Sequence, residues 1–430
     1  MHRYIDSLVP ASRSGAFVIA LALLVAACGQ EPAAPTQAVP ASGMPAAAST
    51  ATAFEGARII VGDGTVIDNG TLVVDGGEIT AVGAAGSVTV PAGASRVNLT
   101  GRTVMPAILD AHVHTNTDLP GLIVDLERRS VLGVGAVLSM GRDADDALLE
   151  LRGNEAPSSA RFFTAGRGIT RPEPGRFDEP HWISTAEEGR EAVRAEAARN
   201  VDVIKIWVDD RDGQYQPLTP DLYGPIIEEA HRLGLRVAAH IFKLDDAKEL
   251  VRAGIDIFAH GVRDRDIDDE FVELVRGRPD LIMIPNLAAR GEPTDLAWLE
   301  GVMPADELAA LRADNVERPE IQEAYGIQAR NLARLDAAGL KIAMGTDGNV
   351  YWGTHVEMED MVAAGMSPAD VIVASTSGSA EAIGITDAGT LAAGKRADFI
   401  VLEANPIEDI TNTRRIVDVY MLGEAVDRSL

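Results

Sequence analysis

The 430-residue sequence contains a single cysteine, Cys28, and aromatic side chains make up only 4% of it. One cysteine excludes a framework of internal disulfide bonds. With so few aromatic residues, the core must be built from Ala, Val, Leu and Ile. Hydrophobic residues nevertheless amount to 46% of the chain, which is enough for a large globular core and excludes disorder throughout the chain.

Positive charge is also scarce. The 38 Lys and Arg residues are outnumbered by 65 Asp and Glu residues, so the formal net charge is −27 at pH 7. An acidic surface repels phosphate backbones, and no Lys/Arg cluster or basic helix offsets that repulsion. The composition therefore disfavours nucleic-acid binding.

The apolar run Ala16–Ala27 near the N-terminus is too short to span a bilayer and is typical of a secretory signal. Residues 25–28, Val-Ala-Ala-Cys, resemble a bacterial lipobox. We expect residues 1–27 to be a cleaved lipoprotein signal peptide and Cys28 to carry the lipid, since two acyl chains give stable membrane attachment. Gly29 favours the outer membrane, facing the periplasm. The alternative is a plain signal peptide with an incidental cysteine.

Two segments near the ends of the chain have the pattern of short β-strands. An Ala/Pro/Ser/Thr-rich tether is expected over residues 28–52. Residues 53–105 then alternate apolar runs with Gly and Asn/Asp turns, and the same pattern returns over residues 389–430. We expect the two segments to pair into one small β-sandwich. The predicted strands are 57–61, 70–74, 78–82, 102–105, 398–402 and 416–422, with a hairpin at Asp75-Gly76-Gly77.

The region between them, residues 106–388, alternates apolar runs of strand length with helical patterns. Such alternation predicts a parallel sheet, and the number of strands, counting one before His112, fits eight. The expected fold class is therefore α/β, with a (β/α)8 TIM barrel. The predicted helices include 185–200, 219–233 and 245–253. The predicted strands are 134–139, 161–165, 203–207, 236–239, 255–259, 281–284 and 341–344.

Five metal-ligand side chains follow these strands at their carboxyl ends. His112 and His114 form an HxH pair after an apolar run, and the spacing places both imidazoles on one face of the strand. His240, His260 and Asp347 each end a different strand. Active sites of this architecture form at the carboxyl ends of the strands. We therefore expect these five side chains to meet and bind a divalent metal.

Lys205 interrupts the apolar run VDVIKIW near the end of another strand. Burial of an ammonium group is costly and favours the neutral amine. A neutral amine can add carbon dioxide, and the resulting carbamate is an anionic ligand that can bridge two metals. The alternative is an ordinary ion pair with Asp209, Asp210 or Asp347.

The set of motifs resembles the amidohydrolase superfamily, in particular its imidazolonepropionase-like branch, which includes the Xaa-Pro dipeptidases. The resemblance covers residues 55–430. It rests on MPAILDAHVHT, VDVIKIW, VAAH, AGIDIFAHG, GTD and the tail AGMSPADVIVASTSGSAEAIGITDAGTLAAGKRADFIVL. It implies the barrel and sandwich described above. It also implies that two divalent ions are held by His112, His114 and Asp347 at one position, by His240 and His260 at the other, and by a bridging, N6-carboxylated Lys205. Zinc suits this mixed imidazole and carboxylate set, and Mn, Co or Fe would also fit.

The resemblance also implies a reaction. A hydroxide shared by the two metals would attack an amide carbonyl, and Asp347 would move the proton to the leaving amine. The expected substrate is a dipeptide or an N-acyl amino acid, but the segment GRGITRPEPGRFD lacks the Gly-Gly-His of prolidase-like members. Two alternatives stay open: a mononuclear hydrolase of a cyclic amide or lactone with a structural Lys205, and a non-catalytic solute-binding lipoprotein. The oligomeric state, including a homo-oligomer, is also open.

Substrate contacts are expected from the loops that follow the strands. His355 lies shortly after Asp347, where relatives place a substrate-contacting histidine, and Tyr215 lies in the loop after Lys205. The alternative for His355 is a surface or helix-capping role. Four arginines that follow strand ends could bind a substrate carboxylate, although pairing with neighbouring acidic residues is favoured in so acidic a chain. They are Arg142, Arg171, Arg263 and Arg290.

Overall fold

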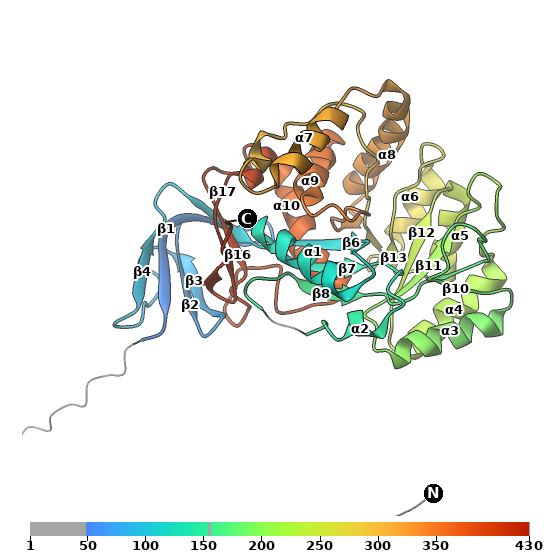
Figure 1. Ribbon diagram of the computed structural model, residues 1–430, viewed down its shortest axis with the longest axis horizontal. Helices are drawn as coiled ribbons and strands as arrows, with labels where there is room; N and C mark the ends of the chain where they lie inside the picture. Colours follow the sequence, from blue (N-terminus) through green and yellow to red (C-terminus); the bar gives the residue numbers. More distant parts are fainter. Residues whose placement is uncertain (1–48, 154–155, 430) are drawn as a thin grey trace, which may run out of the picture. The chain divides into compact units, whose positions relative to one another are not determined.

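The computed structural model describes residues 49–153 and 156–429, which form an α/β structure (Figure 1). The predicted signal peptide, Cys28 and nearly all of the predicted tether lie outside these residues. Among the residues described, there is no helix of the length and apolar character needed to cross a membrane.

Strands from both end segments share one mixed sheet of eight strands, ordered β18-β17-β16-β5-β1-β2-β3 with β4 beside β1. β16 (Phe399–Leu402) runs antiparallel to β5 (Thr103–Pro106), which confirms that the two segments pair. The structure assigns them to a single sheet, and the sandwich stays a prediction. The other strands are β1 (Thr52–Ile60), β2 (Val66–Asp75), β3 (Glu78–Ala84), β4 (Ser95–Asn98), β17 (Ile416–Met421) and β18 (Glu424–Ala425).

Aromatic packing and a tight turn stabilise this sheet. The ring of Phe54 meets those of Phe399 and Tyr420 edge to face, at centroid distances of 5.0 and 4.9 Å. The predicted hairpin is confirmed by Gly76 and Gly77, which join β2 to β3 with φ angles of 58° and 85°. Glycine adopts these left-handed conformations without the steric cost that a side chain would add.

Two parallel sheets form the middle of the chain, as predicted. One has the order β6-β7-β8 and the other β10-β9-β11-β12-β13-β14-β15. The first comprises β6 (Ile108–Val113), β7 (Val134–Ser139) and β8 (Arg161–Thr164). The second comprises β9 (Ile169–Thr170), β10 (His181–Trp182), β11 (Ile204–Val208), β12 (Val237–Ile241), β13 (Ile257–Phe258), β14 (Ile282–Met283) and β15 (Lys341–Ile342).

The edges of the two parallel sheets contact each other. The Ala111 N–H of β6 donates to the Met344 carbonyl at 2.9 Å, just beyond β15. On the other side, the Asp202 N–H donates to the Thr164 carbonyl of β8 at 2.9 Å, just before β11. These contacts are those expected in a ring of strands, but the strands are assigned to two sheets, so a closed barrel stays a prediction.

The predicted helices are present. The segment 185–200 contains α3 (Ala186–Ala198), which begins at a capping box between Thr185 and Glu188. The other two are α4 (Pro220–Arg232) and α5 (Leu244–Ala253). The remaining helices are α1 (Leu119–Val131), α2 (Asp146–Leu149), α6 (Asp269–Arg276), η1 (Ala297–Leu299), α7 (Ala305–Asp314), α8 (Pro319–Ala337), α9 (Gly353–Ala363), α10 (Pro368–Val373), η2 (Ala374–Gly378), α11 (Ser379–Ile383) and η3 (Ile410–Arg414).

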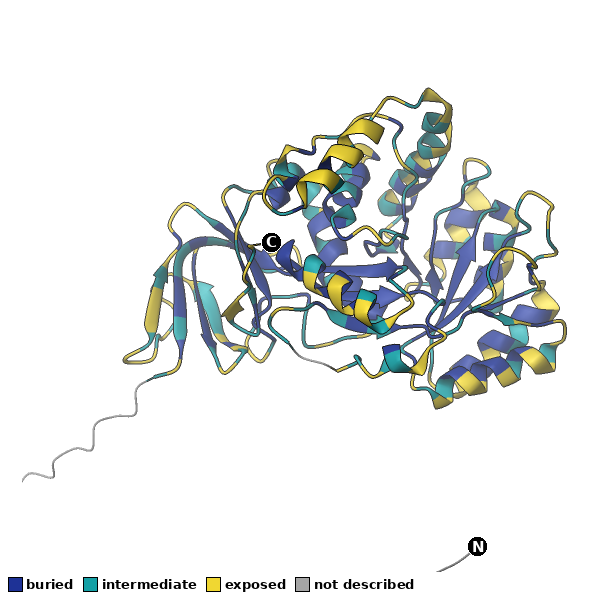
Figure 2. Cartoon of the chain, viewed as in Figure 1, coloured by how far each residue is buried: buried dark blue, intermediate teal, exposed yellow. Residues whose placement is uncertain are grey.

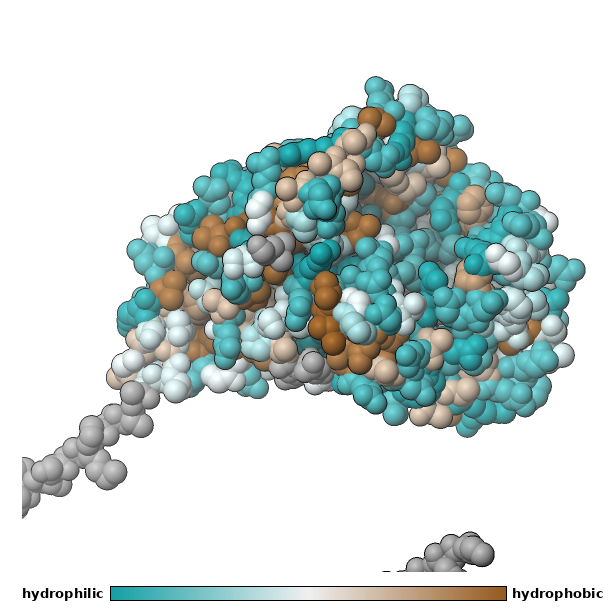
Figure 3. All heavy atoms as spheres, viewed as in Figure 1, coloured by the Kyte–Doolittle hydropathy of each residue, from teal (hydrophilic) through white to brown (hydrophobic). Residues whose placement is uncertain are grey.

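The parallel strands are buried, whereas α3 and α4 bury one face and expose the other (Figure 2). The visible surface is largely hydrophilic, with a hydrophobic patch over α1, where Ile123 and Val124 are exposed (Figure 3). The buried strands carry their polar side chains toward one edge, which is where the candidate site lies.

Candidate metal centre

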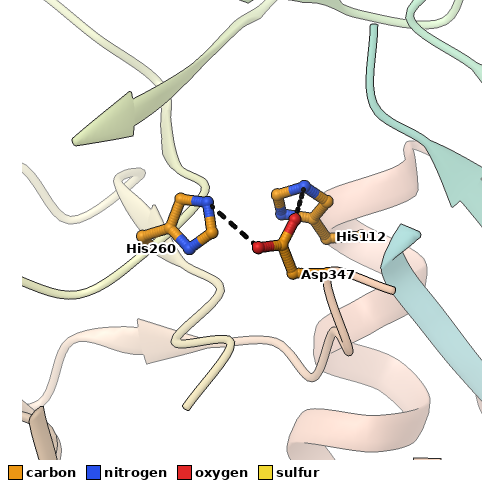
Figure 4. Close-up of side chains that lie close together, drawn as sticks. All are labelled: His112, His260 and Asp347. Carbon is orange, nitrogen blue, oxygen red and sulfur yellow. Dashed lines mark ion pairs between the residues drawn. The ribbon is translucent and has the colours of Figure 1, made fainter. Parts of the chain in front are cut away.

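Asp347 is the meeting point of the predicted histidines. Its Oδ1 lies 3.1 Å from the Nε2 atoms of both His112 and His114, and its Oδ2 lies 3.6 Å from His260 Nε2. Figure 4 shows the carboxylate between the imidazoles of His112 and His260. Ligand atoms of His112, His260 and Asp347 all lie within 4.8 Å of one another, which is close enough to share one ion.

Three parallel strands position these groups. His112 lies in β6 and His114 directly after it, while His260 and Asp347 follow β13 and β15. Thr346 and Asp347 both donate backbone N–H groups to the His112 carbonyl, at 3.0 and 2.8 Å. Asp347 has a φ of 53°, a left-handed conformation that is strained for a residue with a side chain.

His240 joins the cluster through His260. The two rings lie edge to face with centroids 4.4 Å apart. His240 Nε2 lies 2.9 Å from Asp209 Oδ2. The same Nε2 lies 2.9 Å from Arg211 Nη1 and 3.2 Å from Arg263 Nη2, so these neighbours fix the orientation of the ring through Nε2 and leave Nδ1 as the nitrogen for a metal.

Lys205 is buried in β11, with only 1% of its surface exposed. Its Nζ has no hydrogen-bond partner among the described residues. Burial lowers the pKa of this amine from 10.5 to about 7, against the opposing attraction of Asp347. The predicted desolvation is therefore present, and the Asp209 and Asp210 carboxylates make no ion pair with this amine in the described structure, because they bind Arg211 and Lys243 instead.

The electrostatic state of the cluster suits a divalent cation. Burial lowers the pKa of His112 to about 3 and holds the pKa values of His240 and His260 well below 6.5. Burial alone would raise the pKa of Asp347, but the contacts of its carboxylate with His260, His112 and His114 outweigh burial and hold the pKa well below its ordinary value. Metals require neutral imidazoles and ionised carboxylates, so these residues fit a metal ion, and the partnerless Lys205 amine fits a ligand that is completed on metal binding.

The sequence profile of the amidohydrolase family matches residues 103–426, which is most of the chain and includes the whole cluster. The chain belongs to the amidohydrolase family.

Curated proteins similar to this amidohydrolase include enzymes with different names. It is 25% identical over 398 residues to imidazolonepropionase from Deinococcus radiodurans, which covers 84% of this chain and 93% of that protein. It is 28% identical over 261 residues to ochratoxinase from Aspergillus niger, which covers 56% of this chain and 50% of that protein. The chain spans about half the length of the first curated relatives that it matches.

A solved structure of a proposed prolidase from Bifidobacterium longum superposes on this amidohydrolase with a TM-score of 0.73 at 26% identity, covering 89% of this chain and 96% of that one. Amidohydrolases are hydrolases of carbon–nitrogen bonds, and the relatives support that class of reaction.

The two residues predicted to contact the substrate, His355 and Tyr215, both make hydrogen bonds within the chain. His355 is only 1% exposed, its Nδ1 lies 3.1 Å from Thr413 Oγ1, and its Nε2 lies 3.0 Å from the Leu132 carbonyl. With both ring nitrogens engaged, His355 has a structural role in this amidohydrolase, so the expected substrate contact is not supported. Tyr215 donates its hydroxyl to the Pro174 carbonyl at 3.1 Å, which leaves its predicted substrate contact as a proposal.

The four arginines mostly pair with acidic or polar neighbours. Arg142 contacts Glu179 at 2.7 Å, and Arg290 contacts Glu359 at 2.7 Å. Both therefore pair with acidic residues, as predicted. Arg171 donates to Gln216 at 3.0 Å. Arg263 is the exception, because it lies 3.2 Å from His240 Nε2 and donates to the Ile241 carbonyl at 2.9 Å.

Sequence reasoning missed Asn286, which follows β14 and is buried beside the cluster. Its Nδ2 lies 2.6 Å from His112 Nδ1 and donates to the Ala259 carbonyl at 3.0 Å. The signal was available, because Asn286 is a polar residue directly after the predicted strand 281–284, to which no metal ligand was assigned.

Proposed function

We propose that this protein is a metal-dependent amidohydrolase that cleaves the amide bond of a dipeptide or an N-acyl amino acid, with its site at the carboxyl edge of a (β/α)8 barrel flanked by a β-sandwich. The observation that carries the proposal is the position of Asp347, whose carboxylate contacts His112, His114 and His260. The names prolidase and ochratoxinase among the relatives support an amide or dipeptide substrate.

The residues that would hold two divalent ions divide between the two sides of the cluster, and zinc suits their imidazole and carboxylate groups. His112, His114 and Asp347 would hold one ion, His240 and His260 would hold the other, and Lys205, once carboxylated, would supply a ligand to both. The metals would supply a hydroxide at neutral pH and polarise the substrate carbonyl. Asp347 Oδ accepts the proton of the attacking water and delivers it to the leaving amine. Asp209 holds the ring of His240, and Asn286 holds the ring of His112.

A second candidate is a mononuclear hydrolase of a cyclic amide or lactone. It is favoured by the single group of ligand atoms, from His112, His260 and Asp347, that lies within 4.8 Å among the described residues. The long match to imidazolonepropionase also favours it. In that case Lys205 is structural, and bicarbonate does not affect reconstitution.

The test is a substrate panel assayed on the full-length protein after metal removal and reconstitution with zinc. The panel contains Xaa-Pro and other dipeptides, N-acyl amino acids, cyclic amides and lactones. We expect zinc-dependent turnover of at least one dipeptide or N-acyl amino acid. Asp347→Asn should lower kcat by at least about a hundredfold, because it removes the proton-transferring group.

The matched control is His231→Gln, on the outer face of α4, where the His231 side chain is 42% exposed and its Nε2 pairs with Asp256 Oδ2 at 2.8 Å. It should keep wild-type turnover. Full activity of Asp347→Asn, or turnover that does not respond to zinc, would contradict the proposal. Turnover of cyclic amides or lactones alone, with one zinc per chain, would favour the second candidate.

We also propose that the mature protein is lipid-anchored through Cys28 in the bacterial cell envelope, at the outer membrane facing the periplasm. The sequence 25–28 supports it. Cys28→Ser should release the protein from the membrane fraction and abolish incorporation of labelled palmitate. A variant that stays membrane-bound and labelled would show that another residue carries the anchor.

A further inference from the structure

We propose that a buried ion pair, Asp110 with Arg129, positions Asp347 for metal binding. The inference rests on the proposed role of Asp347 and adds two positioning residues to it. Both side chains are 0% exposed, and Arg129 Nη1 lies 3.6 Å from Asp110 Oδ2. Asp110 belongs to β6 and Arg129 to α1, so the pair also joins these two elements.

Asp110 holds the residue before Asp347. Its Oδ1 accepts the Thr346 backbone N–H at 3.1 Å, and its Oδ2 accepts the Thr346 hydroxyl at 2.8 Å. The same Oδ1 lies 3.2 Å from the backbone nitrogen of His112 and accepts its N–H. One carboxylate therefore fixes the chain beside Asp347 and beside the histidine that it contacts.

Arg129 holds the residue after Asp347. Its Nη2 donates to the Gly348 carbonyl at 3.3 Å. Gly348 also forms a parallel bridge with Val113 of β6. The two members of the ion pair thus bind the two neighbours of Asp347, one on each side.

Asp347 needs such a hold because its backbone is strained. A φ of 53° is unfavourable for a residue with a side chain, and such conformations persist only where the surroundings fix them. If its two neighbours are released, the backbone can relax to negative φ. The carboxylate would then move away from His112 and His114.

A purely structural role makes a different prediction. Removing one member of a buried ion pair leaves an uncompensated charge and destabilises a protein wherever the pair lies. A pair that only joins β6 to α1 would therefore affect stability without affecting Asp347. Metal affinity and the backbone at Asp347 separate the two roles, and neither readout needs a known substrate.

The first experiment compares zinc affinity, by competition with a chelating dye, in the full-length wild type and in Arg129→Met. We expect the Kd for zinc to rise at least tenfold, as for other groups that orient metal ligands. The matched control is Arg396→Met. Arg396 pairs with Asp398 at 2.8 Å, and the two side chains are 9% and 6% exposed. This pair lies beside Ala107, before β6 begins, so the control should lose thermal stability but keep wild-type zinc affinity.

A Kd of Arg129→Met within twofold of the wild type would overturn the inference. Thr346→Val serves where Arg129→Met does not fold, because it removes one hydroxyl and leaves the ion pair intact. Its expected loss of zinc affinity is smaller but in the same direction, and an unchanged Kd would again count against the inference.

The second experiment does not depend on metal binding. In crystal structures of the metal-free variants, we expect Asp347 to leave the left-handed region and its Oδ1 to withdraw from His112 and His114. Retention of both contacts in Arg129→Met and Thr346→Val would overturn the inference. If the wild type binds no zinc but the variants show this movement, the proposed function fails and the positioning role stands.

Discussion

Lys205 illustrates how a single side chain links burial to chemistry. Its amine is buried and lies 5.6 Å from the centroid of the Trp207 ring. Burial is the largest cause of its lowered pKa, and the nearby charges of Arg211 and Arg263 lower it further. Near pH 7 a large fraction of the amine is neutral, which is the form that can react with carbon dioxide.

This burial predicts a specific dependence of stability on pH. Between pH 7 and about 10.5 the unfolded chain holds the Lys205 proton and the folded chain does not, so the contribution of Lys205 to the free energy of unfolding rises with pH by up to about 1.4 kcal/mol per unit. Below pH 7 both states hold the proton, and the contribution is flat. Lys205→Met should therefore be more stable than the wild type at pH 7, by a margin that shrinks toward pH 10.

Urea unfolding of the metal-free proteins in bicarbonate-free buffer, at one-unit steps from pH 6 to pH 10, measures this difference. Subtracting the wild type from Lys205→Met cancels the other titrating groups. A difference that stays constant over the whole range would show that the amine is not desolvated as described.

Individual site residues could be predicted from the sequence where a polar side chain breaks a local apolar pattern. His112, His114, His240, His260 and Lys205 each interrupt or end an apolar run, and the structure places them along one edge. Sequence reasoning failed where the role depends on packing between distant segments. The partners of His355, Thr413 and the Leu132 carbonyl, come from segments far away in the sequence. The Asp110–Arg129 pair was missed for a similar reason, because it depends on how α1 packs on β6.

The pairing of β5 with β16 joins segments that are almost 300 residues apart. Phe399 of β16 has 0% of its surface exposed and packs on Phe54 and Tyr420, with ring centroids at 5.0 and 4.7 Å. The shared pattern of short apolar runs and turn residues in the two end segments predicted that they would pair. The register, with Ile400 opposite Met105, could not be predicted, because it depends on which side chains fill the shared core.

Phe399→Ala should lower the free energy of unfolding by about 3–5 kcal/mol, since it removes a buried ring and leaves a cavity. Val417→Ala in neighbouring β17 is the control. Val417 is 37% exposed, so this change should alter stability by less than about 0.5 kcal/mol. Urea denaturation measures both. A loss below about 1 kcal/mol for Phe399→Ala would show that the end segments do not share a core.

Strand lengths show a second limit of sequence reasoning at the scale of elements. The apolar runs 255–259, 281–284 and 341–344 predicted strands, and β13, β14 and β15 are each only two residues long. The backbone hydrogen bonds continue just beyond them, with Ile284 N–H donating to the Phe258 carbonyl at 2.8 Å. The strands end early because the chain turns there to carry His260, Asn286 and Asp347 into the site.

At the scale of the whole molecule, the acidic composition and the candidate site are compatible. A net charge of −27 disfavours polyanionic partners, whereas the cluster presents neutral imidazoles and an ionised carboxylate to cations. The parallel α/β architecture followed from the alternation of strands and helices. Closure of the strands into one ring could not be settled by that pattern, because it depends on a few hydrogen bonds between the edges of two sheets.

The proposed function depends most on whether the cluster around Asp347 binds metal. Anomalous X-ray diffraction at the zinc absorption edge, on crystals of the full-length zinc-reconstituted protein, tests it directly. We predict one peak bounded by His112, His114 and Asp347, a second beside His240 and His260, and added density on Lys205 Nζ between them. A zinc-saturated crystal with no anomalous peak at these side chains would contradict the account.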